Sequence, residues 1–229
     1  MSDATTTADQ SVVDQLDADQ YDAEFFVDTA CPWCWITSRW VTNVQAERNL
    51  KVRWRFIALK ILNEANSNEY SQEHRDSHTA GFNNLRLAHA VRELEGNDAL
   101  GALYTAIGTE IHVRGRFEEL MADQPAFLAA CLETAGLDPS YAKYADDDSR
   151  DAALRAETEE ALARTGPDVG TPIITFNPGR PNEASLFGPV IPKAPKGDEA
   201  VTLWDAVATL AGSGVAEIKR TLRGDISFD

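Results

Sequence analysis

The order of hydrophobic patterns along the chain is the feature that most constrains its fold. Residues 23–29 form a short apolar and aromatic run typical of a buried strand, and residues 35–48 carry apolar side chains on one helical face. Residues 51–59 alternate basic and apolar side chains as far as Phe56, which predicts a second strand. A strand, a helix and a strand within about forty residues form a βαβ unit, so we expect the two strands to be parallel.

The middle of the chain has a different pattern. Residues 63–165 are polar and Ala-rich, and their apolar residues recur at helical spacing. Four helices are predicted there, of which the third begins near Asp123 with Pro125 in its first turn and ends at Gly136, and the fourth covers residues 148–164. The first two are predicted from two apolar stripes, namely Phe82, Leu85, Ala88, Val91 and Leu94, and Leu100, Leu103, Tyr104, Ile107 and Ile111.

Strand patterns return towards the C-terminus. Residues 172–176 and 185–190 flank a turn-rich segment, which predicts a hairpin, and a final helix is expected over residues 198–211. The order β-α-β, four helices, β-β-α indicates one α/β domain interrupted by an all-α insertion. The resulting division is an acidic disordered leader (1–21), an α/β domain (22–62 and 167–229) and a helical insertion domain (63–166).

Composition narrows the range of partners and compartments. The chain has 37 acidic and 21 basic residues, a net charge of −16, and no basic residue in positions 1–24. Nucleic acids and anionic membranes both attract basic surfaces, so we expect neither as a partner. The N-terminal residues lack the basic and apolar regions of a secretory signal, and no apolar run approaches the ~20 residues of a membrane span. Three cysteines are too few for a secreted disulfide scaffold, and we expect a cytoplasmic protein.

The strongest candidate for chemistry is Cys31-Pro32-Trp33-Cys34, at the junction from the first strand into the first helix. If Pro32 is the first helical residue, Cys31 is the N-cap and its sulfur faces the free N–H groups of the first turn. These donors and the helix dipole favour a thiolate, so we expect the pKa of Cys31 to fall from ~8.5 towards ~7 or lower. Cys34 follows one turn later, more enclosed by helix packing, where it can resolve a mixed disulfide.

Two other roles for a close cysteine pair compete with catalysis. A zinc site needs four ligands, and Cys131 and the four histidines offer no second close pair, so no metal is expected. A structural disulfide between Cys31 and Cys34 would close a ring too short to stabilise the fold much. Redox catalysis is therefore favoured, with Cys131 as an inert core residue on the apolar face of its helix.

Two residues outside the pair are candidates for supporting roles. Asp28, three residues before Cys31, either shuttles a proton or raises the thiolate pKa, or it caps the end of the strand. Pro172 opens a later strand, and a cis Thr171–Pro172 bond would place the Thr171 backbone beside the active sulfur. Only ~5% of X–Pro bonds are cis, so this expectation depends on the fold context and not on the dipeptide.

A strand leading into Cys-x-x-Cys on a helix, with a later Thr-Pro before a hairpin, resembles the thioredoxin fold, with a central mixed sheet and flanking helices. The long helical insertion is similar to that of the DsbA family, and Cys-Pro-Trp-Cys resembles its cytoplasmic branch related to the polyketide-pathway protein FrnE. More specific blocks resemble the mycothiol-dependent nitroreductases, and the likeness extends from about residue 22 to the C-terminus. These blocks are CPWCWITSRW (31–40), ILNE (61–64), LYTAIGTEIH (103–112), DVGTP (168–172) and FGPV…IPKAPKGDEA…LWDA (187–206).

The resemblance implies a role for individual residues. Cys31 matches the family nucleophile, Cys34 the resolving cysteine and Pro172 the cis-proline. The residues implied in substrate binding are Trp33 and Asn63, which line the thiol-binding groove, Tyr70 or His74 in place of a groove tyrosine, and Thr171. The implied co-substrate is mycothiol or another low-molecular-weight thiol, with no tightly bound cofactor, and the implied substrates are disulfides and activated nitro compounds.

Three other functions share parts of this pattern. A FrnE-like protein disulfide isomerase would use the same cysteines. A kappa-type thiol transferase or isomerase shares the architecture but activates its thiol with a serine, so the presence of both Cys31 and Cys34 argues against it. A holdase with a redox-sensing disulfide would show no turnover. The choice of mycothiol over glutathione rests on the family likeness alone.

Overall fold

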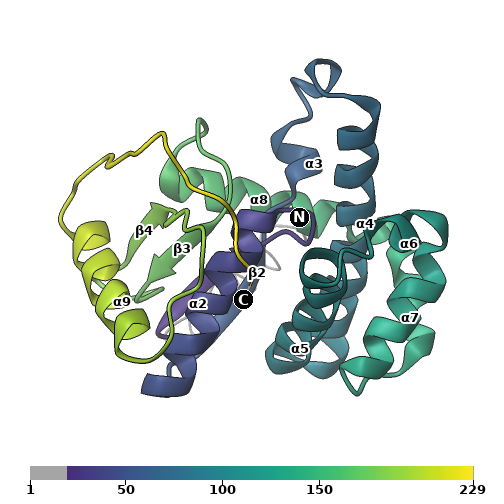
Figure 1. The fold of residues 1–229 in the computed structure, drawn as a ribbon, viewed down its shortest axis with the longest axis horizontal. Helices are drawn as coiled ribbons and strands as arrows, with labels where there is room; N and C mark the ends of the chain where they lie inside the picture. The colour runs from purple at the N-terminus through teal and green to yellow at the C-terminus, as the bar shows by residue number, and fades with distance from the viewer. Residues whose placement is uncertain (1–19, 229) are drawn as a thin grey trace, which may run out of the picture.

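A four-stranded mixed sheet lies at the centre of the molecule (Figure 1). The computed structural model of the chain describes residues 20–228, so the predicted disordered leader lies almost entirely outside the described residues. The sheet order is β2-β1-β3-β4, with β1 and β2 parallel and the other two pairs antiparallel. The strands are β1 (Ala23–Val27), β2 (Val52–Phe56), β3 (Ile173–Phe176) and β4 (Ala184–Phe187). The predicted βαβ unit, hairpin and thioredoxin-type sheet are thereby confirmed.

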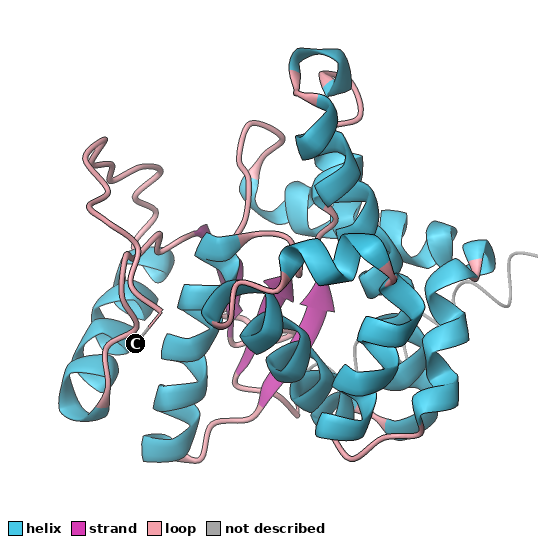
Figure 2. Cartoon of the chain, turned by 45° about the vertical axis from the view of Figure 1, so that its right-hand side comes forward, coloured by secondary structure: helices cyan, strands magenta, loops and turns pink. Residues whose placement is uncertain are grey.

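Helices cover both faces of this sheet (Figure 2). Helices α2 (Pro32–Arg48) and α9 (Gly197–Gly212) pack on one face, where the rings of Trp40 and Trp204 lie 5.6 Å apart. Helix α8 (Asp151–Thr165) covers the other face. Because successive side chains of a strand point to opposite faces, all five residues of β1 are buried. The CPWC segment therefore follows the most enclosed strand of the sheet.

Helical residues fill the chain between β2 and β3, as the polar and Ala-rich pattern predicts. The predicted third helix is α7, and the Asp123 carboxylate accepts the Ala126 N–H at 3.1 Å as its N-cap. The helices of this segment besides α8 are α3 (Leu59–Leu62), α4 (Gln72–Glu95), α5 (Asn97–Gly108), α6 (Phe117–Ala122) and α7 (Gln124–Thr134). Shorter helical turns are η1 (Ser67–Glu69), the π-helical η2 (Thr109–Val113), η3 (Pro139–Asp146) and η4 (Asp148–Arg150). The boundaries of the helical insertion as a separate domain stay a prediction.

Two local expectations are wrong. The second strand was predicted over residues 51–59, but β2 ends at Phe56. Helix α3 begins at Leu59, whose N–H donates to the Asp28 carboxylate at 2.8 Å instead of to a neighbouring strand. Leu94 was expected on the buried stripe of α4, but its exposed fraction is 52%. A strict three-residue spacing drifts around a helix of 3.6 residues per turn, so the end of that stripe rotates towards solvent.

Helix α8 is held to the sheet by a buried network of ion pairs. Glu24 of β1 is fully buried and accepts hydrogen bonds from Arg55 at 3.0 Å and Arg164 at 2.5 Å. Arg55 also donates to Glu157 at 3.0 Å, and Glu157 pairs in addition with Arg92 of α4. The network thus joins β1, β2, α4 and α8. No helix in the described part of the chain has the length and apolar content to cross a bilayer.

Candidate active site

Cys31 caps the N-terminus of α2, as the sequence predicts. Its backbone is extended (φ −88°, ψ 111°), Pro32 is the first helical residue, and the Cys34 N–H donates to the Cys31 sulfur at 3.4 Å. The sulfur therefore accepts from one of the N–H groups that a helix leaves free in its first turn. This geometry follows from the local order of a strand, a cysteine and a proline.

The expected low pKa of Cys31 is wrong. Only 6% of this residue is exposed, and burial raises the pKa of the thiol above its ordinary value. The negative charges of Cys34 and Asp28 raise it further, whereas the Cys34 and Trp33 N–H groups lower it. In this closed dithiol form the cost of burying a thiolate exceeds the benefit of the helix N-terminus, and Cys31 is neutral.

Cys34 lies deeper, inside the first turn of α2. It is fully buried, and its S–H donates to the carbonyl of Phe26 at 3.4 Å. Burial raises the pKa of Cys34 to about 11, while the Thr171 hydroxyl, the Asp28 N–H and the Tyr104 hydroxyl act in the opposite direction. The more enclosed position expected for a resolving cysteine is therefore present.

Asp28 caps the end of β1 and acts on the cysteines through its charge, whereas its role as a proton shuttle stays a prediction. Its carboxylate accepts the N–H of Ala30 at 2.7 Å and the N–H of Leu59 at 2.8 Å, so it caps the strand end and fixes the start of α3. Burial raises the pKa of Asp28 to about 6, despite these two donors. When ionised, the carboxylate raises the pKa of both cysteines.

The Thr171–Pro172 bond is cis, as expected from the fold context. Thr171 is buried immediately before β3, and its hydroxyl, not only its backbone, faces Cys34. A second cis bond, Gly188–Pro189, follows β4 and was not expected. The Pro189 carbonyl accepts the hydroxyl of Thr37 at 2.8 Å, which joins this loop to α2.

The other residues implied in thiol binding form a separate cluster. The Tyr70 hydroxyl donates to the Asn63 side-chain oxygen at 2.7 Å, and the Tyr70 and His74 rings lie 6.1 Å apart. This cluster joins the end of α3 to the start of α4. Within residues 20–228, no hydrogen bond or ring contact links it to the CPWC turn. The structure thus brings Trp33 and Thr171 to the cysteines but keeps Asn63, Tyr70 and His74 in a group of their own.

His112, for which the sequence indicates no role, lies against the loop that leads into the CPWC turn. Its Nε2 donates to the Thr29 carbonyl at 2.9 Å, and its ring stacks on Trp35 with centroids 5.9 Å apart. Burial lowers the pKa of His112 to about 4, so the ring is neutral at pH 7. Nothing in the sequence around His112 indicates this placement, because Thr29 is more than eighty residues away along the chain.

The C-terminal tail, residues 213–228, returns from α9 to the same region (Figure 1). The Ser227 N–H donates to the Pro192 carbonyl at 2.8 Å, and the Phe228 ring stacks on His112 with centroids 6.0 Å apart. The Arg223 guanidinium lies 5.5 Å from the centre of the Trp33 ring. The tail therefore contacts the CPWC turn and the histidine beside it. Its polar sequence without periodicity gives no signal for this contact.

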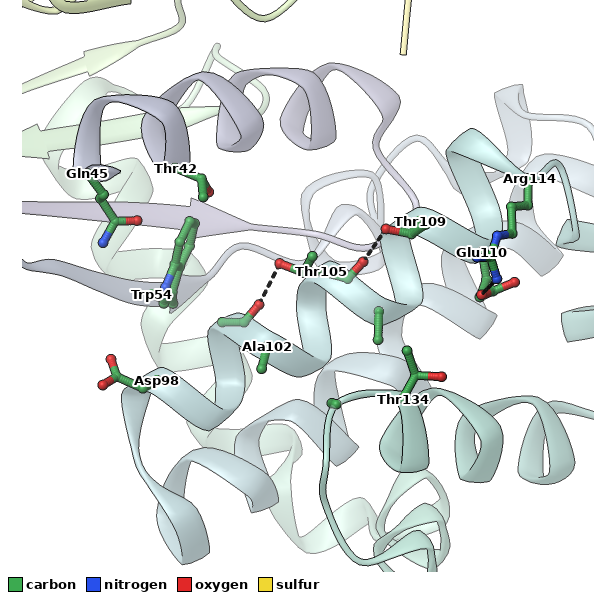
Figure 3. A pocket seen from close by; sticks show the side chains of 13 residues that line it. Thr42, Gln45, Trp54, Asp98, Ala102, Thr105, Thr109, Glu110, Arg114 and Thr134 are labelled. Atoms are coloured by element: carbon green, nitrogen blue, oxygen red, sulfur yellow. Dashed lines mark hydrogen bonds and ion pairs between the residues drawn. The ribbon is translucent and has the colours of Figure 1, made fainter. Parts of the chain in front are cut away.

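A cavity of ≈ 460 Å³ lies elsewhere, between α2, β2, α5 and the end of α7 (Figure 3). The hydroxyls of Thr105 and Thr109 in its wall donate to helix carbonyls at 2.8 and 2.7 Å, and Glu110 pairs with Arg114. None of the residues that line it is a cysteine. The described residues also contain no group of three or more His, Cys, Asp or Glu placed to hold a metal ion. The cavity is therefore separate from the cysteine pair of the CPWC turn.

Comparison with known proteins supports the family resemblance found in the sequence. Residues 30–220 match the family model described as Rv2466c-like, mycothiol-dependent nitroreductase Rv2466c. The chain belongs to this family. A curated relative, the uncharacterised protein Rv2286c of Mycobacterium tuberculosis, is 29% identical over 190 residues, which are 82% of this chain and 76% of that protein.

Solved structures confirm the DsbA-like thioredoxin fold. The cytosolic disulfide reductase DsbM from Pseudomonas aeruginosa superposes with a TM-score of 0.54 at 18% identity, covering 82% of this chain and 99% of that one. A putative protein disulfide isomerase from Nitrosomonas europaea gives a TM-score of 0.50 at 17% identity, covering 82% and 97%. At these identities the likeness concerns the fold and not the activity.

Proposed function

We propose that this member of the family is a thiol–disulfide oxidoreductase that uses mycothiol, with Cys31 as nucleophile and Cys34 as resolving cysteine. The observation that carries the proposal is the first turn of α2, where Cys31 caps the helix, the Cys34 N–H donates to its sulfur, and Cys34 lies one turn deeper. A nucleophile at the end of the helix and a resolving thiol one turn deeper are what exchange through a mixed disulfide requires. The family match supports mycothiol as the thiol.

In the first half of the cycle the cysteine pair is oxidised and the substrate disulfide is reduced. Cys31 first releases its proton to solvent. Its thiolate attacks one sulfur of a disulfide, a Cys31–substrate bond forms, and the other substrate sulfur leaves as a thiolate that takes up a proton from solvent. Cys34 then loses its proton and attacks the Cys31 sulfur, which releases the second substrate thiolate and leaves a Cys31–Cys34 disulfide. Asp28, whose pKa is raised to about 6 and whose charge acts on Cys34, is the carboxylate that would receive the Cys34 proton.

The reductive half restores the dithiol. A mycothiol thiolate attacks Cys31, forming a mixed disulfide and releasing Cys34 as a thiolate. A second mycothiol attacks the mycothiol sulfur of that mixed disulfide, giving mycothiol disulfide and free Cys31. An activated nitro compound is a further substrate under this proposal, because two mycothiol molecules supply the two electrons and two protons that convert it to a nitroso compound and water. We also propose a cytoplasmic location, where free thiols keep such a pair reduced.

The test uses a variant that stops the cycle at the mixed disulfide. Cys34→Ser protein mixed with mycothiol disulfide should gain the mass of one mycothiol on Cys31, with release of one mycothiol, because the resolving thiol is absent. Intact mass and peptide mapping measure the adduct, and glutathione disulfide provides the comparison. Cys31→Ser protein is the matched control and should gain no adduct, since Cys34 lies one turn deeper than Cys31 and is 0% exposed, and Cys131 lies on a different helix and is 2% exposed.

Two outcomes would contradict the proposal. If Cys34→Ser forms no adduct with either disulfide, the pair is not an exchange site for small thiols. If the adduct forms with glutathione disulfide at least as fast as with mycothiol disulfide, mycothiol is not the preferred thiol.

A further inference from the structure

Three buried polar atoms in the described part of the chain have no hydrogen-bond partner. They are Nη2 of Arg39, the hydroxyl of Tyr104 and the hydroxyl of Thr171. A buried polar atom without a partner costs roughly 1–3 kcal/mol, so three such atoms in one place need an explanation. Each belongs to a different part of the fold, namely α2, α5 and the loop before β3.

Two of them, the hydroxyls of Thr171 and Tyr104, face the sulfur of Cys34, and the third belongs to Arg39, which lies beside Tyr104. The hydroxyls of Thr171 and Tyr104 lie close enough to this sulfur to lower the pKa of Cys34, and the Cys34 and Tyr104 charges in turn act on Arg39. The Arg39 guanidinium lies 4.1 Å from the centre of the Trp35 ring and 5.9 Å from that of Tyr104. Cys34 thus has two hydroxyl donors facing its sulfur, with the guanidinium of Arg39 beside one of them.

Arg39 lacks the counter-charge that a buried guanidinium normally has. Its Nη1 donates to the Thr105 hydroxyl at 2.9 Å and its Nε to the Ser38 hydroxyl at 3.2 Å, both neutral acceptors. Within residues 20–228 no carboxylate lies within ion-pair distance of it, although the chain has 37 acidic residues. A buried cation without an anion is costly, which indicates that the anion exists only during part of the reaction cycle.

Tyr104 is suited to donate and not to accept at this position. Burial, followed by the nearby Cys34 charge, holds the pKa of Tyr104 well above its ordinary value, so the hydroxyl keeps its proton. A neutral S–H group is a weak acceptor, whereas a thiolate accepts strong charge-assisted hydrogen bonds. The unused donors therefore match the ionised form of Cys34 and not the thiol.

We propose that Tyr104, Thr171 and Arg39 form an anion pocket that stabilises the Cys34 thiolate. The inference rests on the proposed function, in which Cys34 is a thiolate twice per cycle. When a thiolate opens the Cys31–Cys34 disulfide, its bond to Cys31 forms, the bond between the two cysteines breaks, and the electron pair goes to the Cys34 sulfur. Tyr104 and Thr171 donate hydrogen bonds to that sulfur, and Arg39 is a positioning residue that holds the Tyr104 ring and adds a positive charge.

The other titratable groups near Cys34 raise its pKa and so oppose formation of the thiolate. Asp28 at the end of β1 is an acidic group that raises the pKa of Cys34 when ionised, and Cys31 on the same helix is the remaining titratable neighbour. The buried position of the sulfur raises the pKa as well. The pocket on α2, α5 and the β3 loop is the source of stabilisation that opposes these effects.

The test is a titration of Cys34 in Cys31→Ser protein, followed by the carbon-13 signal of labelled cysteine Cβ atoms. The variant holds two cysteines, and an added Cys131→Ala leaves Cys34 as the only labelled one, because the pKa of Cys131, raised to about 12, would overlap that of Cys34, raised to about 11. Adding Tyr104→Phe or Arg39→Leu should raise the pKa of Cys34, lowering its thiolate population at a fixed pH about tenfold, because a charge-assisted hydrogen bond is lost. Arg39→Lys should restore most of the population.

The controls separate a local from a general effect. Tyr141→Phe makes the same chemical change at a tyrosine that bonds Glu95 on the surface, and it should leave the Cys34 titration unchanged. If folded Tyr104→Phe protein titrates Cys34 at the same or a lower pH, the pocket does not exist. Tyr104→Phe removes one oxygen atom and keeps the ring, so this arm stays informative even if Arg39→Leu fails to fold. The titration contains no mycothiol, so its result is independent of the adduct test of the proposed function.

Discussion

At the scale of single residues, burial controls the chemistry of Cys31 more than the helix N-terminus does. A helix terminus contributes typically 0.3–1 kcal/mol, which is less than the 1.36 kcal/mol of one pKa step, whereas full burial shifts a thiol by several times that amount. The raised pKa of Cys31 follows from this comparison. Forming its thiolate therefore requires that the groups covering the sulfur move apart or that a neighbouring negative charge is neutralised.

The carboxylate of Asp28 gives a direct test of whether a neighbouring negative charge opposes formation of the Cys31 thiolate. Asp28→Asn removes the negative charge near both cysteines, so the pKa of each thiol should fall and the alkylation rate of Cys31 at neutral pH should rise about threefold to tenfold. Mass spectrometry of the Cys31 peptide after timed iodoacetamide treatment measures the rate. Asp22→Asn, at the other end of β1, is the matched control and should leave the rate unchanged. An equal or slower rate in Asp28→Asn would show that the carboxylate does not oppose thiolate formation.

The sequence accounts for the local part of the site and not for its surroundings. The N-cap position of Cys31 was predictable because a strand, Cys31 and Pro32 are contiguous. The pKa of Cys31 was not, because burial and the nearby charge of Asp28 depend on how the whole chain packs. The same holds for Tyr104, which the pattern placed on a buried helix face without showing that the face meets Cys34.

At the scale of elements, α5 approaches the rest of the molecule through glycines. A Cβ atom at Gly108 would lie 2.2 Å from the Trp35 ring, and one at Gly101 would lie 2.8 Å from Nε1 of Trp54. Two tryptophans, one on α2 and one on β2, therefore pack directly on the backbone of α5. This close approach is also what brings Tyr104, between the two glycines, to the cysteine helix.

Gly108→Ala should therefore destabilise the protein although alanine is the better helix former. Displacing a buried tryptophan ring costs roughly 1–3 kcal/mol, and the helix propensity gained returns at most about 1 kcal/mol. Urea unfolding followed by circular dichroism gives the change in the free energy of unfolding. Gly212→Ala, at the exposed end of α9 with no atom within 4 Å of the added Cβ, should be neutral or slightly stabilising. A neutral Gly108→Ala would mean that Trp35 can move away at no cost.

Helices with long apolar stripes were predictable, and short ones were not. The stripe from Leu100 to Ile111 is buried throughout, and α7 begins where Asp123 and Pro125 indicate. Helices α3 and α6 have four and six residues, too few for a periodic pattern to be distinguished from chance. Helix α3 begins where the Asp28 carboxylate accepts a backbone N–H, a contact between residues thirty-one positions apart.

At the scale of the whole molecule, the chain has an excess of acidic residues, and buried arginines form ion pairs with some of them in the interior. Burial raises the pKa of Glu157, but the charges of Arg92 and Arg55 outweigh it and lower the pKa to about 2, from an ordinary value of 4.5. The folded protein thus binds fewer protons at this site than the unfolded chain between these two pH values. The network stabilises the fold fully above pH 4.5, and its contribution is lost as the pH falls towards 2.

Arg92→Met should reduce the free energy of unfolding at pH 7 by ~3 kcal/mol, because it leaves Glu157 short of one buried partner. The same substitution should flatten the decline in stability between pH 4.5 and pH 2, since the pKa of Glu157 moves back towards its ordinary value. Thermal unfolding across this pH range measures both effects. Arg48→Met, in the exposed pair with Asp205, is the control and should cost less than ~1 kcal/mol. Equal losses for the two variants would contradict a special role of the buried network.

The topology of the whole molecule was more predictable than its long-range contacts. The βαβ unit and the hairpin were predictable from the sequence, because elements joined by short connections usually pack together. The return of the C-terminal tail to Trp33 and His112 depends on side-chain contacts across the fold, and no local pattern encodes them.

The path of this tail has a practical consequence for work with the protein. Phe228 stacks on His112, whose Nε2 binds the loop that leads into Cys31, so any sequence fused behind the tail starts near the CPWC turn. A purification tag or fluorescent reporter at that end would change access to this turn. Kinetic constants from such a fusion would then describe the added segment as much as the enzyme.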